Sequence, residues 1–178
     1  MLRIIKIAGI LVVVFIAGVL ILAAFRPDTF RVERSASIKA PPEKIFPYIN
    51  EFKRWDAWSP WEKKDPGMKR TYGATLTGKG ATYAWEGNKD VGKGRMEIAE
   101  SVEPRRVAIK LDFVAPFEAH NDVVFTLEPK GDATQVRWTM QGHTPYFARI
   151  IHLFFDMDKM VGKDFEAGLA SLKAAAEK

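Results

Sequence analysis

The C-terminal stretch, residues 145–178, constrains the fold more than any other part of the chain. Its apolar residues recur in steps of three and four, which is typical of a helix with one buried face. Thr144 is expected to cap this helix and Pro145 to occupy its first position. The apolar row consists of Phe147, Ile150, Ile151, Phe154, Met157, Val161, Phe165, Leu169 and Leu172.

This C-terminal helix needs a sheet as its partner. A continuous helix of roughly 30 residues is about 45 Å long, and the sequence offers no second helix that would cover it. We therefore expect a sheet to cover its apolar face. Gly162 and Gly168 lie within the predicted helix, where the absence of a side chain lets a neighbouring surface approach closely.

The N-terminal segment is a candidate membrane anchor. Residues 7–25 include no polar side chain, and as a helix they would span roughly 28 Å, close to a bilayer's hydrocarbon core. A cleaved signal peptide and a buried core helix are the alternatives. The run is longer than a usual signal sequence, its end is a poor cleavage site, and it has no polar face. We expect a retained single-pass anchor over residues 1–26, followed by one domain over residues 27–178.

Charge near this anchor bears on topology and on partners. The formal net charge is +5, and Arg3, Lys6 and Arg26 flank the apolar run. A short basic N-terminus ahead of a first span usually stays in the cytoplasm, so the C-terminal domain is expected on the outer (periplasmic or extracytoplasmic) side. The domain has no basic stripe with interleaved aromatic residues, so nucleic acid is not an expected partner. The chain has no cysteine, which excludes disulfides and thiol chemistry.

The domain has the pattern of an antiparallel sheet. Residues 30–38 alternate between apolar and polar, as a half-buried strand does, and Arg34 interrupts the inner row and is expected near an end. A short helix is expected to begin after Ala40-Pro41-Pro42. Short connections rich in turn residues separate the later strands and predict antiparallel pairing. These strands are expected over residues 69–72, 81–87, 94–102, 105–114, 118–128 and 134–142.

Together these elements predict an α+β fold. A curved antiparallel sheet of about seven strands would wrap around the long C-terminal helix, preceded by the single transmembrane helix. A straight helix does not fill a curved sheet, so we expect a small-molecule cavity between them. Trp55, Trp58 and Trp61 follow the short helix. They have two interpretations: plugs that close the open end of the sheet, or side chains that gate the cavity or dip toward lipid.

The chain resembles the START-like superfamily, also called SRPBCC or Bet v 1-like, and within it the polyketide cyclase/dehydrase-type branch; this resemblance implies the helix-grip fold. The resemblance covers about residues 30–175. Members include lipid carriers, hormone receptors, cyclases and a co-chaperone, so the resemblance implies the fold and a ligand cavity rather than one activity. The residues that carry it are 32–46 (strand, then Ala-Pro-Pro and a helix), 52–61 (Phe-Lys-Arg-Trp-Asp-Ala-Trp-Ser-Pro-Trp), 83–88 (Tyr-Ala-Trp-Glu-Gly-Asn) and 157–169 in the final helix.

The sequence offers little catalytic machinery. His120, His143 and His152 are not at metal-ligand spacing, so no metal and no cofactor is expected. Glu86 is the one weak catalytic candidate. By strict alternation it faces solvent as an ordinary surface charge; if a bulge turned it inward, burial would raise its pKa and make it a general acid or base. Asp112 and Asn121 are weaker candidates of the same kind.

The leading hypothesis is a membrane-anchored domain that binds a hydrophobic small molecule or lipid between sheet and helix. Polar groups such as Tyr83, Glu86, Asn121 and Gln141 would orient the ligand. Two alternatives stay open: a cyclase or dehydratase that uses a cavity carboxylate, and a ligand-free structural module of the cell envelope. The expected ligand-binding residues are Trp55, Trp58, Tyr83, Trp85, Ile109, Leu111, Phe113, Phe125, Trp138, Met140, Ile151, Phe154, Met157 and Val161.

Overall fold

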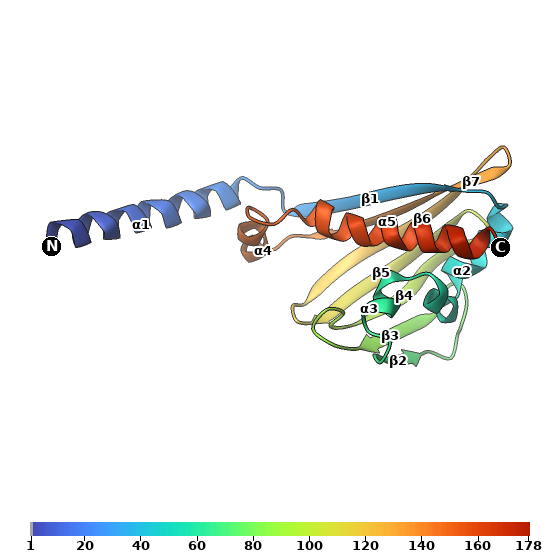
Figure 1. Ribbon diagram of the computed structural model, residues 1–178. Helices are drawn as coiled ribbons and strands as arrows, with labels where there is room; N and C mark the ends of the chain where they lie inside the picture. Colours follow the sequence, from blue (N-terminus) through green and yellow to red (C-terminus); the bar gives the residue numbers. More distant parts are fainter. Residues whose placement is uncertain (1) are drawn as a thin grey trace.

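The computed structural model describes residues 2–178 and shows a curved sheet around a long helix, with one helix projecting at the N-terminus (Figure 1). The helices are α1 (Leu2–Ala24), α2 (Pro42–Asn50), the 3-10 helix η1 (Phe52–Ala57), α3 (Pro60–Lys64), α4 (Tyr146–Ile151) and α5 (Met157–Ala176). The strands are β1 (Thr29–Ile38), β2 (Lys69–Tyr72), β3 (Thr82–Glu86), β4 (Lys93–Val102), β5 (Arg106–Ala115), β6 (Ala119–Lys130) and β7 (Ala133–His143).

The seven strands form one sheet in the order β1-β7-β6-β5-β4-β3-β2. Each neighbouring pair is antiparallel, so β2 to β7 form a run of hairpins and β1 closes the sheet beside β7. Alternation places Val107, Ile109 and Leu111 on the inner face, where they are buried. The prediction of an α+β fold with a seven-stranded antiparallel sheet around a C-terminal helix is confirmed.

Helix α5 packs closely on the inner face of the sheet. Phe165, Leu169 and Leu172 are buried there. A Cβ atom added to Gly168 would lie 2.8 Å from the Trp138 ring and 3.1 Å from Pro60. A Cβ atom added to Gly162 would collide with the guanidinium of Arg34. Both glycines therefore allow the close approach that the sequence indicated.

The prediction of one continuous helix over residues 145–178 is wrong. Residues 152–156 form a corner between α4 and α5, and Asp156 caps α5 by accepting a hydrogen bond from the Lys159 backbone N–H at 3.1 Å. The 20 residues of α5 span about 30 Å, and the 10 residues of β1 span about 33 Å, so α5 is as long as the sheet that covers it. Residues before the corner extend beyond the sheet, where α4 contacts the end of α1 instead.

The first half of the predicted apolar row is consequently not in the core. Phe147 and Phe154 are each 64% exposed and Ile151 is 37% exposed. The start of the helix also differs from the expectation. Pro145 is the residue before α4, and the Thr144 side chain does not cap the helix; its hydroxyl is buried without a hydrogen-bond partner.

Arg34 lies in the middle of β1, which corrects the expectation that it sits near a strand end. Its guanidinium donates two hydrogen bonds of 2.9 Å to the Asp158 carboxylate and one of 2.7 Å to Glu166, both on α5. This pairing lowers the pKa of Asp158. Arg34 interrupts the apolar row because it joins the edge strand to the helix.

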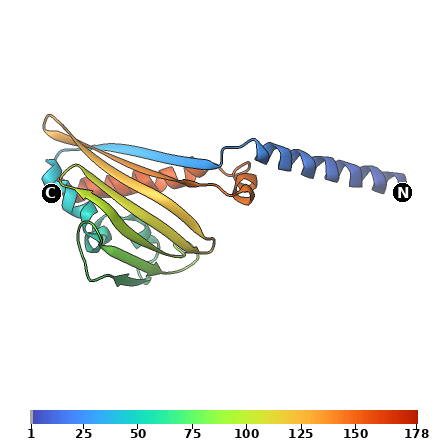
Figure 2. The same ribbon diagram turned by 180° about the vertical axis from the view of Figure 1, so that it is seen from behind.

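Helix α1 projects away from the domain, as Figures 1 and 2 show from opposite sides. Residues 3–24 are long and apolar enough to cross a membrane, although a signal sequence passes the same test, and only 6% of the apolar window is buried. One contact with the domain is a 2.7 Å hydrogen bond that the Tyr146 hydroxyl donates to the Leu20 carbonyl. The absence of burial means that α1 is not a core helix of this domain.

We expect the substitution Gly168→Ala to destabilise the protein by about 1–3 kcal/mol, because the added methyl group meets the rigid Trp138 ring. The sign of the change in the free energy of unfolding is informative, since Gly to Ala in an unconstrained helix is stabilising by up to about 1 kcal/mol. Urea unfolding of the full-length protein in detergent, followed by tryptophan fluorescence, measures the change. Ala170→Ser, at an exposed position of α5, is the control and should have little effect. Equal stability of Gly168→Ala and the unaltered protein would contradict the packing.

Candidate functional site

Aromatic side chains fill the space beneath the middle of α5. The rings of Trp138 and Phe165 stack with centroids 4.0 Å apart, and Trp58 and Phe125 lie 5.4 Å and 4.9 Å from Trp138. The indole N–H groups of Trp55 and Trp58 donate to the carbonyls of Ile49 and Tyr48 at 3.0 and 2.8 Å. Trp55 and Trp58 are therefore core plugs, the first of the two interpretations that the sequence allowed.

The expected ligand-binding residues separate into three groups by burial. The first group is packed in the core: Trp55, Trp58, Tyr83, Ile109, Phe125 and Trp138. The second group lies nearer to the α1 end of the sheet. Trp85, Leu111 and Met140 are buried there, and Phe113, Met157 and Val161 are half-buried. The third group, Ile151 and Phe154, lies in α4 and the corner, outside the layer between sheet and helix.

One inward-facing polar atom in the second group's neighbourhood lacks a partner. Asn121 lies on β6 in the same inward row as Val123, opposite Leu111 and Gly142 of the flanking strands. Its side-chain oxygen is buried and accepts no hydrogen bond. A Cβ atom on Gly142 would collide with this oxygen, so the glycine makes room for the amide. An unpaired buried oxygen is costly, and a donor on a ligand would satisfy it.

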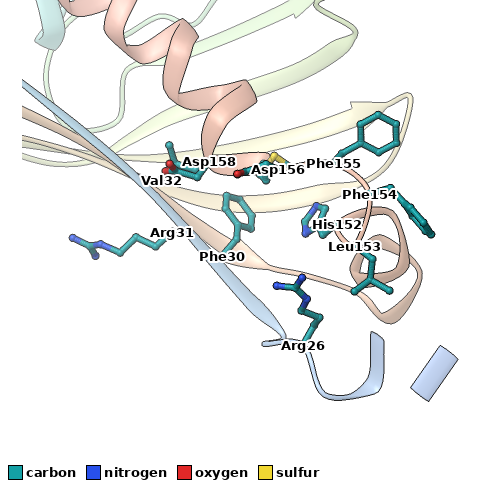
Figure 3. Close-up of a pocket in the computed structure, with 11 residues that line it drawn as sticks. Arg26, Phe30, Arg31, Val32, His152, Leu153, Phe154, Phe155, Asp156 and Asp158 are labelled. Atoms are coloured by element: carbon teal, nitrogen blue, oxygen red, sulfur yellow. The ribbon is translucent and has the colours of Figure 1, made fainter. Parts of the chain in front are cut away.

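A pocket of about 490 Å³ lies at the α1 end of the domain, between the start of β1 and the corner before α5 (Figure 3). Its apolar walls come from Phe30, Val32, Leu153 and Met157. Figure 3 shows Phe30, His152 and Asp156 around one space, with Arg26 nearby. Phe154 and Phe155 of the corner line the same pocket and are largely exposed. A second pocket of about 360 Å³ lies between Tyr48, Lys63 and the C-terminal end of α5.

The charged groups of the larger pocket are mostly engaged. Asp158 is held by Arg34, Asp156 caps α5, and Arg31 pairs with Glu33 at 2.6 Å. Arg26 makes no side-chain hydrogen bond or ion pair within residues 2–178. The pocket therefore combines apolar walls with one cation that is available to a ligand's polar group.

A buried carboxylate that the sequence analysis missed lies at the other side of the interior. Glu62 on α3 has only 8% of its side chain exposed and pairs with Arg70 at 2.6 Å. It also accepts a 2.7 Å hydrogen bond from the Tyr83 hydroxyl. Burial and this bond raise the pKa of Tyr83 far above its ordinary value. Glu62 falls in a polar stretch that resembles a linker, and only the helix start at Pro60 signals that it is held against the sheet.

Glu86 does not enter the interior. Its side chain is 60% exposed and lies 3.2 Å from Lys93 on the outside of the sheet. Asp112 is also on the outer face, where it binds His120 at 2.7 Å and Arg95 at 3.0 Å. The interpretation of Glu86 as a surface charge is therefore the one the structure supports, and the bulge that would turn it inward is not there.

Comparison with known proteins identifies the family. A family model described as polyketide cyclase/dehydrase and lipid transport matches residues 29–177. No curated protein matches the chain significantly in sequence.

Solved structures share the fold at low sequence identity. A Chromobacterium violaceum protein matches with a TM-score of 0.60 at 16% identity, covering 86% of this chain and 99% of its own. The Aha1 protein of Colwellia psychrerythraea, solved as a dimer, has a TM-score of 0.57 at 21% identity, with coverage of 83% and 96%. The di-domain ARO/CYC BexL from the BE-7585A biosynthetic pathway has a TM-score of 0.60 at 12% identity, with coverage of 88% and 53%. Such low identities support the fold alone.

We expect Tyr83→Phe to destabilise the protein by about 1–3 kcal/mol, because it removes a buried hydrogen bond to a charged group. Urea unfolding of the full-length protein measures the loss. Tyr48→Phe is the matched control, since the Tyr48 hydroxyl makes a longer 3.3 Å bond to a backbone carbonyl in a half-buried position. A loss for Tyr83→Phe no greater than that for the control would show that the Glu62–Tyr83 bond is not structural.

Proposed function

Because the chain belongs to the polyketide cyclase/dehydrase and lipid transport family, we propose that residues 27–178 form a domain that binds a hydrophobic small molecule or a lipid. We place the site between the sheet and the C-terminal helix, at the end near α1. The residues proposed to contact the ligand are Trp85, Leu111, Phe113, Met140, Met157 and Val161, with Asn121 as the polar group that orients it.

The single observation that carries this proposal is the uneven packing of the interior. Beneath the middle of α5 the stacked rings of Trp138 and Phe165 leave no room for a ligand. Toward α1, the sheet still presents apolar side chains, but Phe113, Met157 and Val161 are only half covered. Burial of apolar surface contributes about 25 cal/mol per Å², so a hydrophobic ligand that completes this cover would gain binding energy.

Two features of the α1 end favour an amphipathic ligand over a purely apolar one. The unpaired oxygen of Asn121 accepts a hydrogen bond from a ligand donor. The adjacent pocket has a volume of about 490 Å³, within the usual range for small-molecule sites. Arg26 and His152 line it together with apolar side chains. A lipid has this combination of an apolar chain and a polar head.

Membrane attachment is part of the same proposal. We propose that α1 is retained as a single-pass span over residues 1–26 and that residues 27–178 lie on the outer side of the membrane. The support is the length and hydropathy of residues 3–24 and their exposure in the structure. An anchor of this kind holds the site close to ligands that partition into the bilayer.

The rival hypothesis of a cyclase or dehydratase that uses Glu86 has less support. An acid or base must lie within hydrogen-bond reach of the substrate proton, and Glu86 is on the outer face beside Lys93. Glu62 is buried, but Arg70 and Tyr83 occupy its oxygens. The second alternative is a structural module that binds no ligand. The binding experiment below distinguishes it from the proposed function.

The test compares lipid retained by the full-length protein and by two tryptophan variants. We expect native mass spectrometry after extensive detergent exchange to show one retained hydrophobic ligand on the unaltered protein. Val161→Trp places a bulky ring on the half-buried face of α5 and should reduce this occupancy at least about five-fold, since the added volume fills the proposed site.

Ala170→Trp is the control, because position 170 is exposed on the same helix. It should retain the ligand to the same extent as the unaltered protein. Tryptophan fluorescence during thermal unfolding shows whether both variants fold. If the folded, unaltered protein retains no ligand, or if both variants retain it equally, the proposed site is wrong.

A further inference from the structure

The exposed phenylalanines of the domain are confined to one region. Among the described residues after α1, those with exposed rings are Phe25, Phe117, Phe147, Phe154 and Phe155, at 84, 71, 64, 64 and 59%. The remaining phenylalanines of the domain are buried or half-buried. Scattered exposed apolar residues are normal in soluble proteins, but a set of large aromatic rings confined to one end indicates an interaction surface.

The strand register explains why these residues share one end of the domain. Thr29 at the start of β1 pairs with His143 at the end of β7. Gly142, the residue before His143, pairs with Asn121 near the start of β6. The β5–β6 turn, with Phe117 at its tip, extends beyond these paired residues, because Phe113 pairs with Ala119. Figures 1 and 2 show α4 and the β5–β6 turn at the end from which α1 leaves.

We infer that this end of the domain docks onto the surface of the bilayer, with Phe117, Phe147, Phe154 and Phe155 inserted at the boundary between headgroups and acyl chains. The inference rests on the proposal that α1 spans the membrane. It goes beyond that proposal because a membrane span does not by itself place side chains of the domain in the lipid, whereas docking fixes the ligand site against the bilayer surface.

Continuity with α1 is what favours a lipid surface as the occupant. The Tyr146 hydroxyl on α4 donates to the Leu20 carbonyl in the last turns of α1, so α4 lies against the end of the apolar helix. The phenylalanines of α4 and the corner thus continue the apolar surface of α1 at the level where the chain leaves it. Amphipathic helices that lie in the interface bury their apolar face to about 5–10 Å.

Two arginine side chains lie beside this surface. Arg149 lies over the Tyr146 ring, with its guanidinium 5.8 Å from the ring centroid, and donates a 3.1 Å hydrogen bond to the Thr144 carbonyl. Arg26 lies two residues after the end of α1. Arginine can place its aliphatic stem along apolar surface and its charged head in a polar layer, which suits the headgroup region.

The experiment uses site-directed spin labels on the full-length protein in phosphatidylcholine nanodiscs. The natural chain has no cysteine, so each label is unique. Labels are placed by Phe117→Cys and Phe154→Cys at the docking surface and by Val13→Cys at the middle of α1. Lys130→Cys, exposed at the far end of β6, is the control. All four positions are exposed in the domain or in α1, so the substitutions leave the core intact.

Accessibility to oxygen, which concentrates in lipid, is compared with accessibility to a water-soluble nickel chelate. We expect labels at positions 117 and 154 to favour oxygen over the chelate by at least about three-fold relative to position 130, and the label at position 13 to favour oxygen most. If position 13 is in lipid but positions 117 and 154 match position 130, docking is refuted while the anchor stands. If position 13 itself is accessible to the chelate, the anchor proposal fails.

A third pattern identifies a different occupant. If positions 117 and 154 are protected from both reagents, a protein surface such as a second copy covers them, and the lipid-docking inference is overturned.

Discussion

The structure depends on the match in length between α5 and the sheet that surrounds it. Helix α5 is stabilised where sheet lies beneath it: at Gly168, where Trp138 approaches the helix backbone, and at Gly162, where Arg34 does. Beyond the edge of the sheet the helix has no sheet to pack on; the chain turns at residues 152–156, and α4 contacts the end of α1. Most helical stability in proteins comes from such packing rather than from intrinsic propensity. The same limit determines which apolar residues enter the core and which remain exposed beside α1.

This limit also divides the interior into a filled part and an incompletely covered part. The aromatic cluster around Trp138 occupies the region that a ligand would fill if the cavity ran the length of the helix. The less covered residues Phe113, Met157 and Val161, the unpaired oxygen of Asn121 and the pocket beside Arg26 all lie toward the α1 end. A site at that end would face the bilayer if α1 spans it, which links the proposed ligand to its source.

The sequence was most informative where residues have regular partners. Alternation along residues 105–114 and 134–142 predicted β5 and β7 nearly as they are, because both strands have one buried and one solvated face. The helix was predicted too long, since Phe147, Ile151 and Phe154 keep the helical spacing although no sheet covers them. Periodicity shows which face is apolar but not whether protein or another surface covers it.

Single polar residues in the interior were harder to predict. Arg34 was assigned to a strand end because its charge breaks an apolar row, but its partners Asp158 and Glu166 are more than a hundred residues away in the chain. Glu62 was missed for the same reason, since Arg70 and Tyr83 become its partners only when α3 folds against β2 and β3. Local patterns do not include such long-range pairs. Within the candidate site, local sequence patterns indicated which residues are apolar. They did not show which of these residues pack against one another in the core and which remain available to a ligand.

Photolabelling of the full-length protein in proteoliposomes tests the central claim most directly. A phospholipid with a diazirine in its acyl chain is photolysed, and the labelled peptides are mapped by mass spectrometry. The account predicts labels on inward-facing residues of the domain near the α1 end, such as Leu111, Phe113, Met140 and Val161, in addition to α1. Labelling restricted to α1 and to the exposed phenylalanines beside it would contradict a lipid site between the sheet and the helix.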